Sequence, residues 1–378
     1  MSRFSRRAAC GFLAAVLAGA ALLAQTPSPA AAGPTDAQAR LDRVRSQIFA
    51  SADGLTNAIP ELKAILALDP TLAEAHMLLG VAYRGVGSES FAGEAKAELQ
   101  QAIELEPGLV AARLMLTQVY FDLGRYENAR DEATAALQLV PGQAQFLAVL
   151  AEAERNLGNA ERALALSNLA IQADAGLPQA RYYRGLALID LGRRDEGIQQ
   201  LQEVANAGVV TPEVYLHLGT ALIDAGRLQD AVAALTFGAK IGPAFREIHI
   251  ALARAYRLGN SLRLADEQLT LAAGNPGNVQ VTPAYQRLET ALNRERGLLR
   301  LKQARLPAAA EALEAAITMD PADGASHQAL AEVYLRQGLL AKARDEAALA
   351  ASLGAPLAPA LQQRLGTSAP APAAKGLP

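Results

Sequence analysis

The sequence predicts an all-α protein, a solenoid of about nine helix–turn–helix repeats within residues 39–357. A short turn recurs with its glycine at Gly124, Gly158, Gly192 and Gly226, so each step is 34 residues. Each period holds two helical apolar patterns, and such a hairpin buries its apolar face only by stacking on neighbours. The composition is rich in alanine, lacks tryptophan and is 4% aromatic, which favours helices in close contact.

A column of small residues follows the same period. Seven alanines and one glycine form it: Ala95, Ala129, Ala163, Gly197, Ala231, Ala265, Ala309 and Ala343. The steps are 34 residues except the one from Ala265 to Ala309, which is 44. An insertion of ten residues therefore lies between two blocks of repeats, most simply at Gln280–Glu289.

Val110–Gly142 illustrates one repeat. Leu114, Leu116 and Tyr120 are placed on one apolar helical face, and the segment after the turn spaces its alanines at helical intervals. Pro141-Gly142 ends the second helix, because proline cannot continue a helix and glycine adopts conformations that other residues resist. The glycine between the helices permits a positive φ where the chain reverses.

The pattern Leu79-Gly80-x2-Tyr83, followed by Ala95 and Pro107, resembles the tetratricopeptide repeat family. The resemblance implies a right-handed superhelix in which the first helix of each repeat lines a concave groove. The family's tryptophan position departs from the pattern and holds other residues throughout: His76, Arg113, Leu147, Arg181, Tyr215, His249 and His327.

The repeats divide the chain as follows: 39–72, 73–109, 110–143, 144–177, 178–211, 212–245, 246–279, 290–323 and 324–357, with the insertion at 280–289. Thr282-Pro283 is a good helix start, so either the first helix of the eighth repeat is lengthened or an extra half-helix interrupts the array; the first is simpler. We expect a short capping helix at 358–365 and a disordered Pro/Ala-rich tail at 366–378.

Residues 1–32 have the pattern of a secretory signal peptide, followed by a linker at 33–38. Three N-terminal arginines precede the uncharged segment Ala8–Ala24, and cleavage after Ala32 is expected. The sole cysteine, Cys10, would be removed with it. The mature chain is thus expected to be periplasmic or secreted, by Sec or twin-arginine export, with an uncleaved membrane anchor as the alternative.

Neither catalysis nor a cofactor is predicted. The chain contains no nucleophile-elbow, P-loop, dinucleotide-loop or zinc-protease motif, and the repeats leave no room for a catalytic domain. His76, His249 and His327 fall in one column of the repeat, so they are interpreted as packing residues that cannot converge on a metal. The net charge of −3 gives no reason to expect nucleic acid as a partner.

The offsets of the repeat place candidate partner-binding residues on the concave groove. They are mostly apolar or aromatic: Met77, Leu78, Met115, Phe121, Tyr182, Tyr183, Leu186, Ile189 and His217. Tyrosine and methionine give large, adaptable contacts to an apolar segment. The corresponding offsets of the late repeats are polar, with Arg254, Arg257, Arg294 and Glu295 among them.

The sequence therefore favours a non-catalytic protein–protein interaction scaffold of the bacterial cell envelope, which binds an apolar helix or extended peptide in the concave groove. One alternative is a membrane-anchored assembly or secretion factor that retains the signal helix. Another is the repeat arm of a polysaccharide secretion complex. The expected partners are proteins or peptides, with membrane contact only if the signal helix is retained.

Overall fold

The structure is a computed structural model that describes residues 36–48, 54–86, 91–208, 211–274, 282–355, 357 and 359–366. The predicted signal peptide, residues 33–35 of the predicted linker and residues 367–378 of the predicted tail lie outside this part of the chain. Residues 280 and 281 of the predicted insertion also lie outside it.

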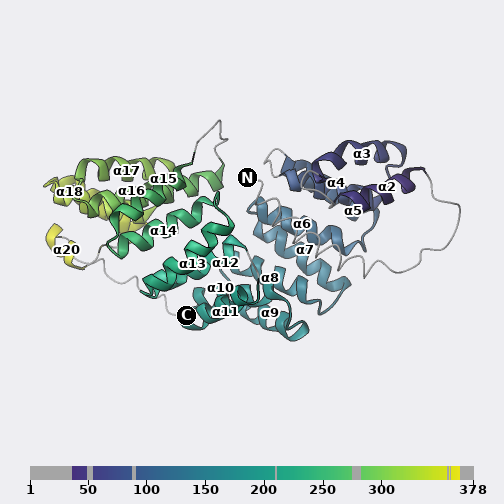
Figure 1. Ribbon diagram of the computed structural model, residues 1–378, viewed down its shortest axis with the longest axis horizontal. Helices are drawn as coiled ribbons and strands as arrows, with labels where there is room; N and C mark the ends of the chain where they lie inside the picture. The colour runs from purple at the N-terminus through teal and green to yellow at the C-terminus, as the bar shows by residue number, and fades with distance from the viewer. Residues whose placement is uncertain are drawn as a thin grey trace, which may run out of the picture. The chain divides into compact units, whose positions relative to one another are not determined.

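All of the regular structure in the described residues is helical, which confirms the all-α fold class (Figure 1). The helices up to residue 224 are α2 (Asp36–Gln47), α3 (Gly54–Leu68), α4 (Ala73–Val86), α5 (Ala92–Leu105), α6 (Val110–Asp122), α7 (Tyr126–Leu139), α8 (Ala144–Asn156), α9 (Ala160–Ala173), α10 (Pro178–Asp190), α11 (Arg194–Asn206) and α12 (Pro212–Asp224). The later helices are α13 (Leu228–Ile241), α14 (Arg246–Leu258), α15 (Leu262–Ala273), α16 (Pro283–Lys302), α17 (Leu306–Met319), α18 (Gly324–Arg336), α19 (Leu340–Ser352) and α20 (Pro359–Leu365).

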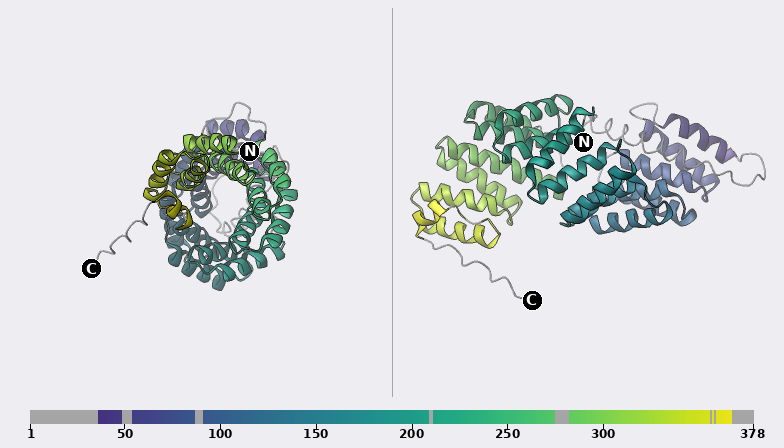
Figure 2. Two further views of the ribbon diagram at one scale, coloured as in Figure 1. Left: turned by 90° about the vertical axis from the view of Figure 1, so that its left-hand side faces the viewer. Right: turned by 90° about the horizontal axis from the view of Figure 1, so that it is seen from below.

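The chain forms two compact bodies, residues 1–214 and residues 215–378, which we call the N-terminal and C-terminal bodies. In both, helices pack in successive pairs such as α8 with α9 and α18 with α19 (Figure 2). The first helices of neighbouring pairs also contact one another, as α8 does with α10 and α14 with α16. Second helices such as α9 and α15 pack between two first helices, so the first helices form a layer of their own within each body.

The predicted column of small residues lies where the two helices of a pair meet. Ala129, Ala163, Ala231 and Ala309 are completely buried, and so are most members of the column. Glycines of the first helices also lie in close contact with the second helices. A Cβ atom added to Gly219 of α12 would lie 2.3 Å from Cγ of Leu235 of α13. The helices therefore approach to a distance at which a larger side chain cannot fit.

The turn between paired helices uses a left-handed residue, as the recurring glycine predicted. At Gly192 the φ angle is +77°, and the next amide, that of Arg193, donates to the carbonyl oxygen of Leu188 at 2.8 Å. This bond across five residues is the helix-terminating motif that favours glycine. Asn260 and Ala304 occupy the same position of later repeats with φ angles of +62° and +59°.

Replacing Ala304 by glycine should therefore stabilise the protein. A left-handed alanine costs about 1–2 kcal/mol in backbone strain, which glycine avoids. We expect Ala304→Gly to raise the unfolding free energy in urea by about 1 kcal/mol and Gly192→Ala to lower it by a similar amount. Equal stability of Ala304→Gly and the wild type would contradict this, since both positions are solvent-exposed turns.

At the position where the family has tryptophan, several repeats have a histidine or an arginine that contacts two other groups. We call this pair of contacts a clamp. His327 Nδ1 lies 2.6 Å from Oε2 of Glu346 on α19, and its Nε2 lies 3.1 Å from the carbonyl oxygen of Pro321. His76 contacts Glu98 and the Pro70 carbonyl oxygen in the same way. Each clamp ties the loop before the first helix to the second helix of the same pair.

Arginine makes the same clamp in two other repeats. Arg113 donates to Glu132 at 2.9 Å and to the carbonyl oxygen of Pro107 at 3.3 Å. Arg181 donates to Glu203 and to the carbonyl oxygen of Ala175. The histidines of this column therefore have structural partners within their own repeat, consistent with their interpretation as packing residues.

Loss of one clamp should destabilise its repeat, whereas a clamp in which arginine replaces histidine should keep most of the stability. We expect His327→Leu to lower the unfolding free energy by about 1–3 kcal/mol, because it leaves the carboxylate of Glu346 and a carbonyl oxygen without a donor. His327→Arg should restore most of that loss. Thermal unfolding followed by circular dichroism measures both; equal losses in the two variants would show that the clamp contributes nothing.

Candidate functional site

The predicted groove residues fall into two sets by exposure. Met77, Leu78, Met115 and Leu186 are at least 95% buried among neighbouring helices, so their side chains fill the interior of the N-terminal body. The other five predicted residues are partly exposed: Phe121, Tyr182, Tyr183, Ile189 and His217. Partner binding by this set stays a prediction, and the four buried residues act in packing.

Two of the predicted residues belong to a polar cluster in the N-terminal body. The rings of Tyr182 and Tyr183 on α10 meet edge-on with centroids 5.2 Å apart, and the hydroxyl of Tyr183 donates to Glu152 of α8. Burial raises the pKa of Glu152 to about 7, although the hydrogen bond from Tyr183 and the positive charge of Arg155 oppose this shift. Burial also raises the pKa of both tyrosines.

Ion pairs join consecutive first helices in both bodies. In the N-terminal body, Arg84 of α4 pairs with Asp122 of α6 at 2.6 Å, and Arg155 of α8 pairs with Asp190 of α10 at 2.7 Å. Sequence reasoning missed these pairs. Their signal was available, because the two arginines occupy one column of the repeat and the two aspartates occupy another.

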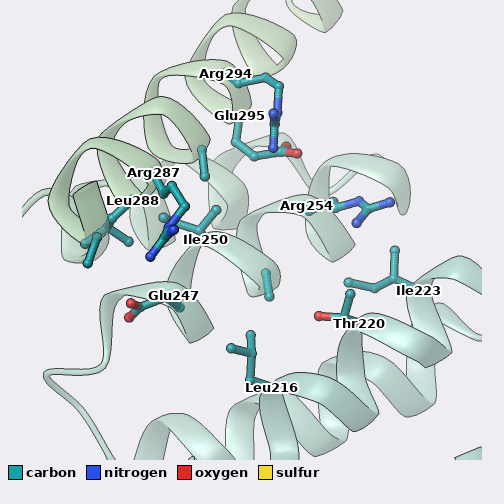
Figure 3. Close-up of a pocket in the computed structure, with 13 residues that line it drawn as sticks. Leu216, Thr220, Ile223, Glu247, Ile250, Arg254, Arg287, Leu288, Arg294 and Glu295 are labelled. Carbon is teal, nitrogen blue, oxygen red and sulfur yellow. The ribbon is translucent and has the colours of Figure 1, made fainter. Parts of the chain in front are cut away.

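The C-terminal body contains a hollow of about 400 Å³ between α12, α14 and α16 (Figure 3). Apolar side chains from all three helices line it: Leu216, Ile223, Ile250 and Leu288. Leu216 and Thr220 of α12 lie across the hollow from Arg287 and Leu288 of α16. Its volume lies within the range of about 300–1,000 Å³ typical of ligand pockets.

A second hollow of about 650 Å³ lies between α14, α16, α18 and α20. It shares Arg254, Arg294 and Glu295 with the first hollow, so the two are neighbours along the first-helix layer. Leu298 and Leu361 supply apolar surface there. We refer to the two hollows together as the C-terminal groove.

Helix α16 supplies one wall of this groove because it is unusually long. It has 20 residues, whereas α14 and α18 each have 13. Thr282 caps its start by accepting a hydrogen bond from the amide of Tyr285 at 3.1 Å, and Pro283 occupies the first turn. The continuous helix confirms the simpler of the two interpretations of the insertion.

The added turns of α16 present one face to the first hollow. The lining residues of this helix begin with Ala284, Arg287, Leu288 and Ala291, at the spacing i, i+3, i+4 and i+7 of a single helical face. Sequence reasoning missed Arg287 and Leu288, although that spacing is readable in the sequence. It did name Arg254, Arg294 and Glu295 among the polar groove positions.

Ion pairs hold most of the groove's charged side chains in place. Arg254 pairs with Asp224 at 2.8 Å, Arg257 with Glu295 at 2.9 Å, and Arg294 with Asp323 at 2.7 Å. These pairs connect α12, α14, α16 and the start of α18. The groove is therefore bounded by arginine side chains whose positions are fixed by neighbouring carboxylates.

The described residues form neither a metal-binding cluster nor a membrane-spanning helix. Within these residues, no group of histidine, cysteine, aspartate and glutamate side chains could hold a metal ion. Of the helices that the structure describes, none combines the length and apolarity required to span a membrane.

Comparison with known sequences identifies the repeats. Family models described as tetratricopeptide repeat match residues 92–153, 182–243 and 294–359, which together make up half of the chain. No curated protein sequence matches the chain.

The solved structures that the chain is similar to share little sequence with it. The APC/C hetero-tetramer Cut9–Hcn1 is 15% identical with a TM-score of 0.67; the match covers 88% of this chain and 63% of that one. TTC0263, a thermophilic repeat protein of Thermus thermophilus, is 22% identical over 49% of this chain and 99% of its own, with a TM-score of 0.44. YrrB, a protein with an unusual peptide-binding site, is 18% identical over 50% and 95%, with a TM-score of 0.35.

Proposed function

Because the chain belongs to the tetratricopeptide-repeat family, we propose that it is a non-catalytic scaffold that holds a segment of a partner protein in the C-terminal groove. The observation that carries this proposal is the pair of adjoining hollows, about 400 and 650 Å³, on the first-helix layer. Each combines apolar surface with a few fixed polar groups, which is the composition of binding sites. Their size suits side chains of an extended or helical segment rather than a folded domain.

Site-specific crosslinking in cells tests this proposal. A photoreactive amino acid at Leu288, in the wall of the groove, should give an adduct with a partner protein. The same amino acid at Leu349 serves as the control, because this residue is 47% exposed on the second helix α19. Adducts at Leu288 with none at Leu349 are expected. Adducts of equal yield at both positions, or at neither, would exclude the groove as the binding site.

We further propose that the scaffold acts in the periplasm or outside the cell. The support is the sequence of the N-terminus, in which Arg3, Arg6 and Arg7 precede the uncharged segment Ala8–Ala24 and small residues lead to Ala32. N-terminal sequencing of the protein from fractionated cells tests this. A chain that begins at Gly33 in the periplasmic or secreted fraction is expected, whereas an intact Met1 in the membrane fraction would favour the anchored alternative.

A further inference from the structure

We propose that the bound segment carries a bulky apolar side chain next to a carboxylate, and that the added turns of α16 select for this combination. The inference rests on the proposed function, since it specifies what the C-terminal groove binds. It assigns the recognition of the carboxylate to arginines of α14 and α16, and that of the apolar side chain to the floor of the first hollow.

The first hollow accepts an apolar side chain because its floor is apolar on three sides. Leu216 comes from α12, Ile250 from α14 and Leu288 from α16. Ala251 and Ala291 widen the space by their small size. A leucine or phenylalanine of the partner would bury apolar surface here without leaving a polar group unsatisfied.

Arginine outnumbers acidic side chains around this floor. Arg254, Arg287 and Arg294 line the first hollow, against Glu247 and Glu295. Glu295 is directed to Arg257, whose Nε and Nη2 lie 2.9 and 3.4 Å from its two oxygens. Asp224 and Asp323 balance the charges of Arg254 and Arg294, so Arg287 is the arginine of this rim whose charge favours an anionic group on the partner.

The arginines retain donors for a ligand even where they are paired. Nη2 of Arg254 donates to Asp224 and Nη1 of Arg294 donates to Asp323. Each guanidinium group has five N–H donors, so one contact leaves others to bind a second carboxylate. Arg287 is exposed and makes no ion pair with any residue that the structure describes. Replacing Arg287 should therefore leave no neighbouring carboxylate without an ion-pair partner.

Arg287 and Leu288 depend on the insertion. They lie in the N-terminal turns by which α16 exceeds the 13 residues of α14 and α18. One turn of one helix thus provides both a cation and an apolar side chain at the same hollow. This arrangement is specific to this place in the array, and a partner must match both groups at once.

Selection from a peptide library tests the inference. Random peptides of about twelve residues displayed on phage are selected on the immobilised full chain, on Arg287→Gln and on a control variant, Arg263→Gln. Arg263 is a suitable control because it lies on the second helix α15 with its side chain 86% exposed. Peptides from wild type and control should be enriched in aspartate or glutamate beside leucine, isoleucine or phenylalanine.

Binding measurements with one selected peptide then show how much the charge of its acidic residue contributes to affinity, separately from its shape. Replacing its acidic residue by the matching amide should weaken binding to the wild type about tenfold, the value of a charge-assisted hydrogen bond. The same replacement should have little effect on binding to Arg287→Gln, and added salt should reduce the wild-type preference.

The results distinguish the two proposals. Selected peptides that lack acidic residues, or that keep an equal acidic preference on Arg287→Gln, would overturn this inference and leave groove binding standing. Failure to enrich any peptide on the wild-type chain would overturn both the inference and the proposed function.

Discussion

Gly219→Val is expected to lower the free energy of unfolding by roughly 1–3 kcal/mol or more, the cost of overpacking a closely packed interior. A Cβ atom at this position would lie 2.3 Å from Cγ and 2.5 Å from Cδ2 of Leu235. Cγ is bonded directly to the Cβ of Leu235, so it cannot move away without displacing α13 or forcing an unfavourable rotamer. Urea unfolding followed by circular dichroism measures the loss.

Two further variants identify the cause. Gly93→Val is the matched control, because no atom lies within 4 Å of an added Cβ there, and it should leave stability within about 0.5 kcal/mol. In a double-mutant cycle, Leu235→Ala should be less damaging together with Gly219→Val than alone, since the valine then fills the vacated space. Simple additivity of the two losses would show that the contact between these residues is not the cause.

Stability should also fall as the pH rises toward neutrality because of Glu152. Its pKa in the folded chain, about 7, exceeds the ordinary value of 4.5, so the folded state holds the proton more tightly. The stabilisation is complete below about pH 4.5 and is lost as the pH rises through 7. Between 4.5 and about 7, at about 1.4 kcal/mol per pKa unit, the decline should be on the order of 3.5 kcal/mol.

Glu152→Gln should remove this part of the pH dependence. Glutamine still accepts the hydrogen bond from Tyr183 and carries no charge, so the variant should exceed the wild type in stability at pH 8 and match it near pH 4.5. The charged groups around Glu152, namely Arg155, Asp122 and Arg84, stay in both proteins. Glu267→Gln, on the exposed surface of α15, should keep the wild-type pH profile. An unchanged profile in Glu152→Gln would contradict the assignment.

The fold could be predicted from the periodicity of the sequence, because the two helices of each repeat pack against each other in the same way. The alanine column follows from the close approach of paired helices, and the turn glycine follows from a φ angle of +77° at Gly192. Asn260 and Ala304 occupy the same turn position without being glycine, so the backbone geometry there is set by the surrounding helices.

The candidate site was less predictable, because side-chain exposure depends on neighbours that the period does not specify. Met77 and Met115 have groove offsets and are buried, whereas Phe121 and Ile189, at later groove offsets, are partly exposed. The half-buried acid Glu152 beside Tyr183 arises from a contact between two repeats. Leu288 was missed because it lies outside the repeat pattern on which the prediction depended.

The insertion enlarges the wall of the groove at a distance along α16 from the closest helix–helix contact of this helix. The added turns of α16 lie at its start, while Gly297 further along still meets Leu313 of α17 as Gly219 meets Leu235 in an earlier pair. Gain or loss of these turns would change the wall of the groove and leave the contact between Gly297 and Leu313 in place. A change at this helix start would therefore alter the wall of the groove without disturbing the close approach of Gly297 to Leu313.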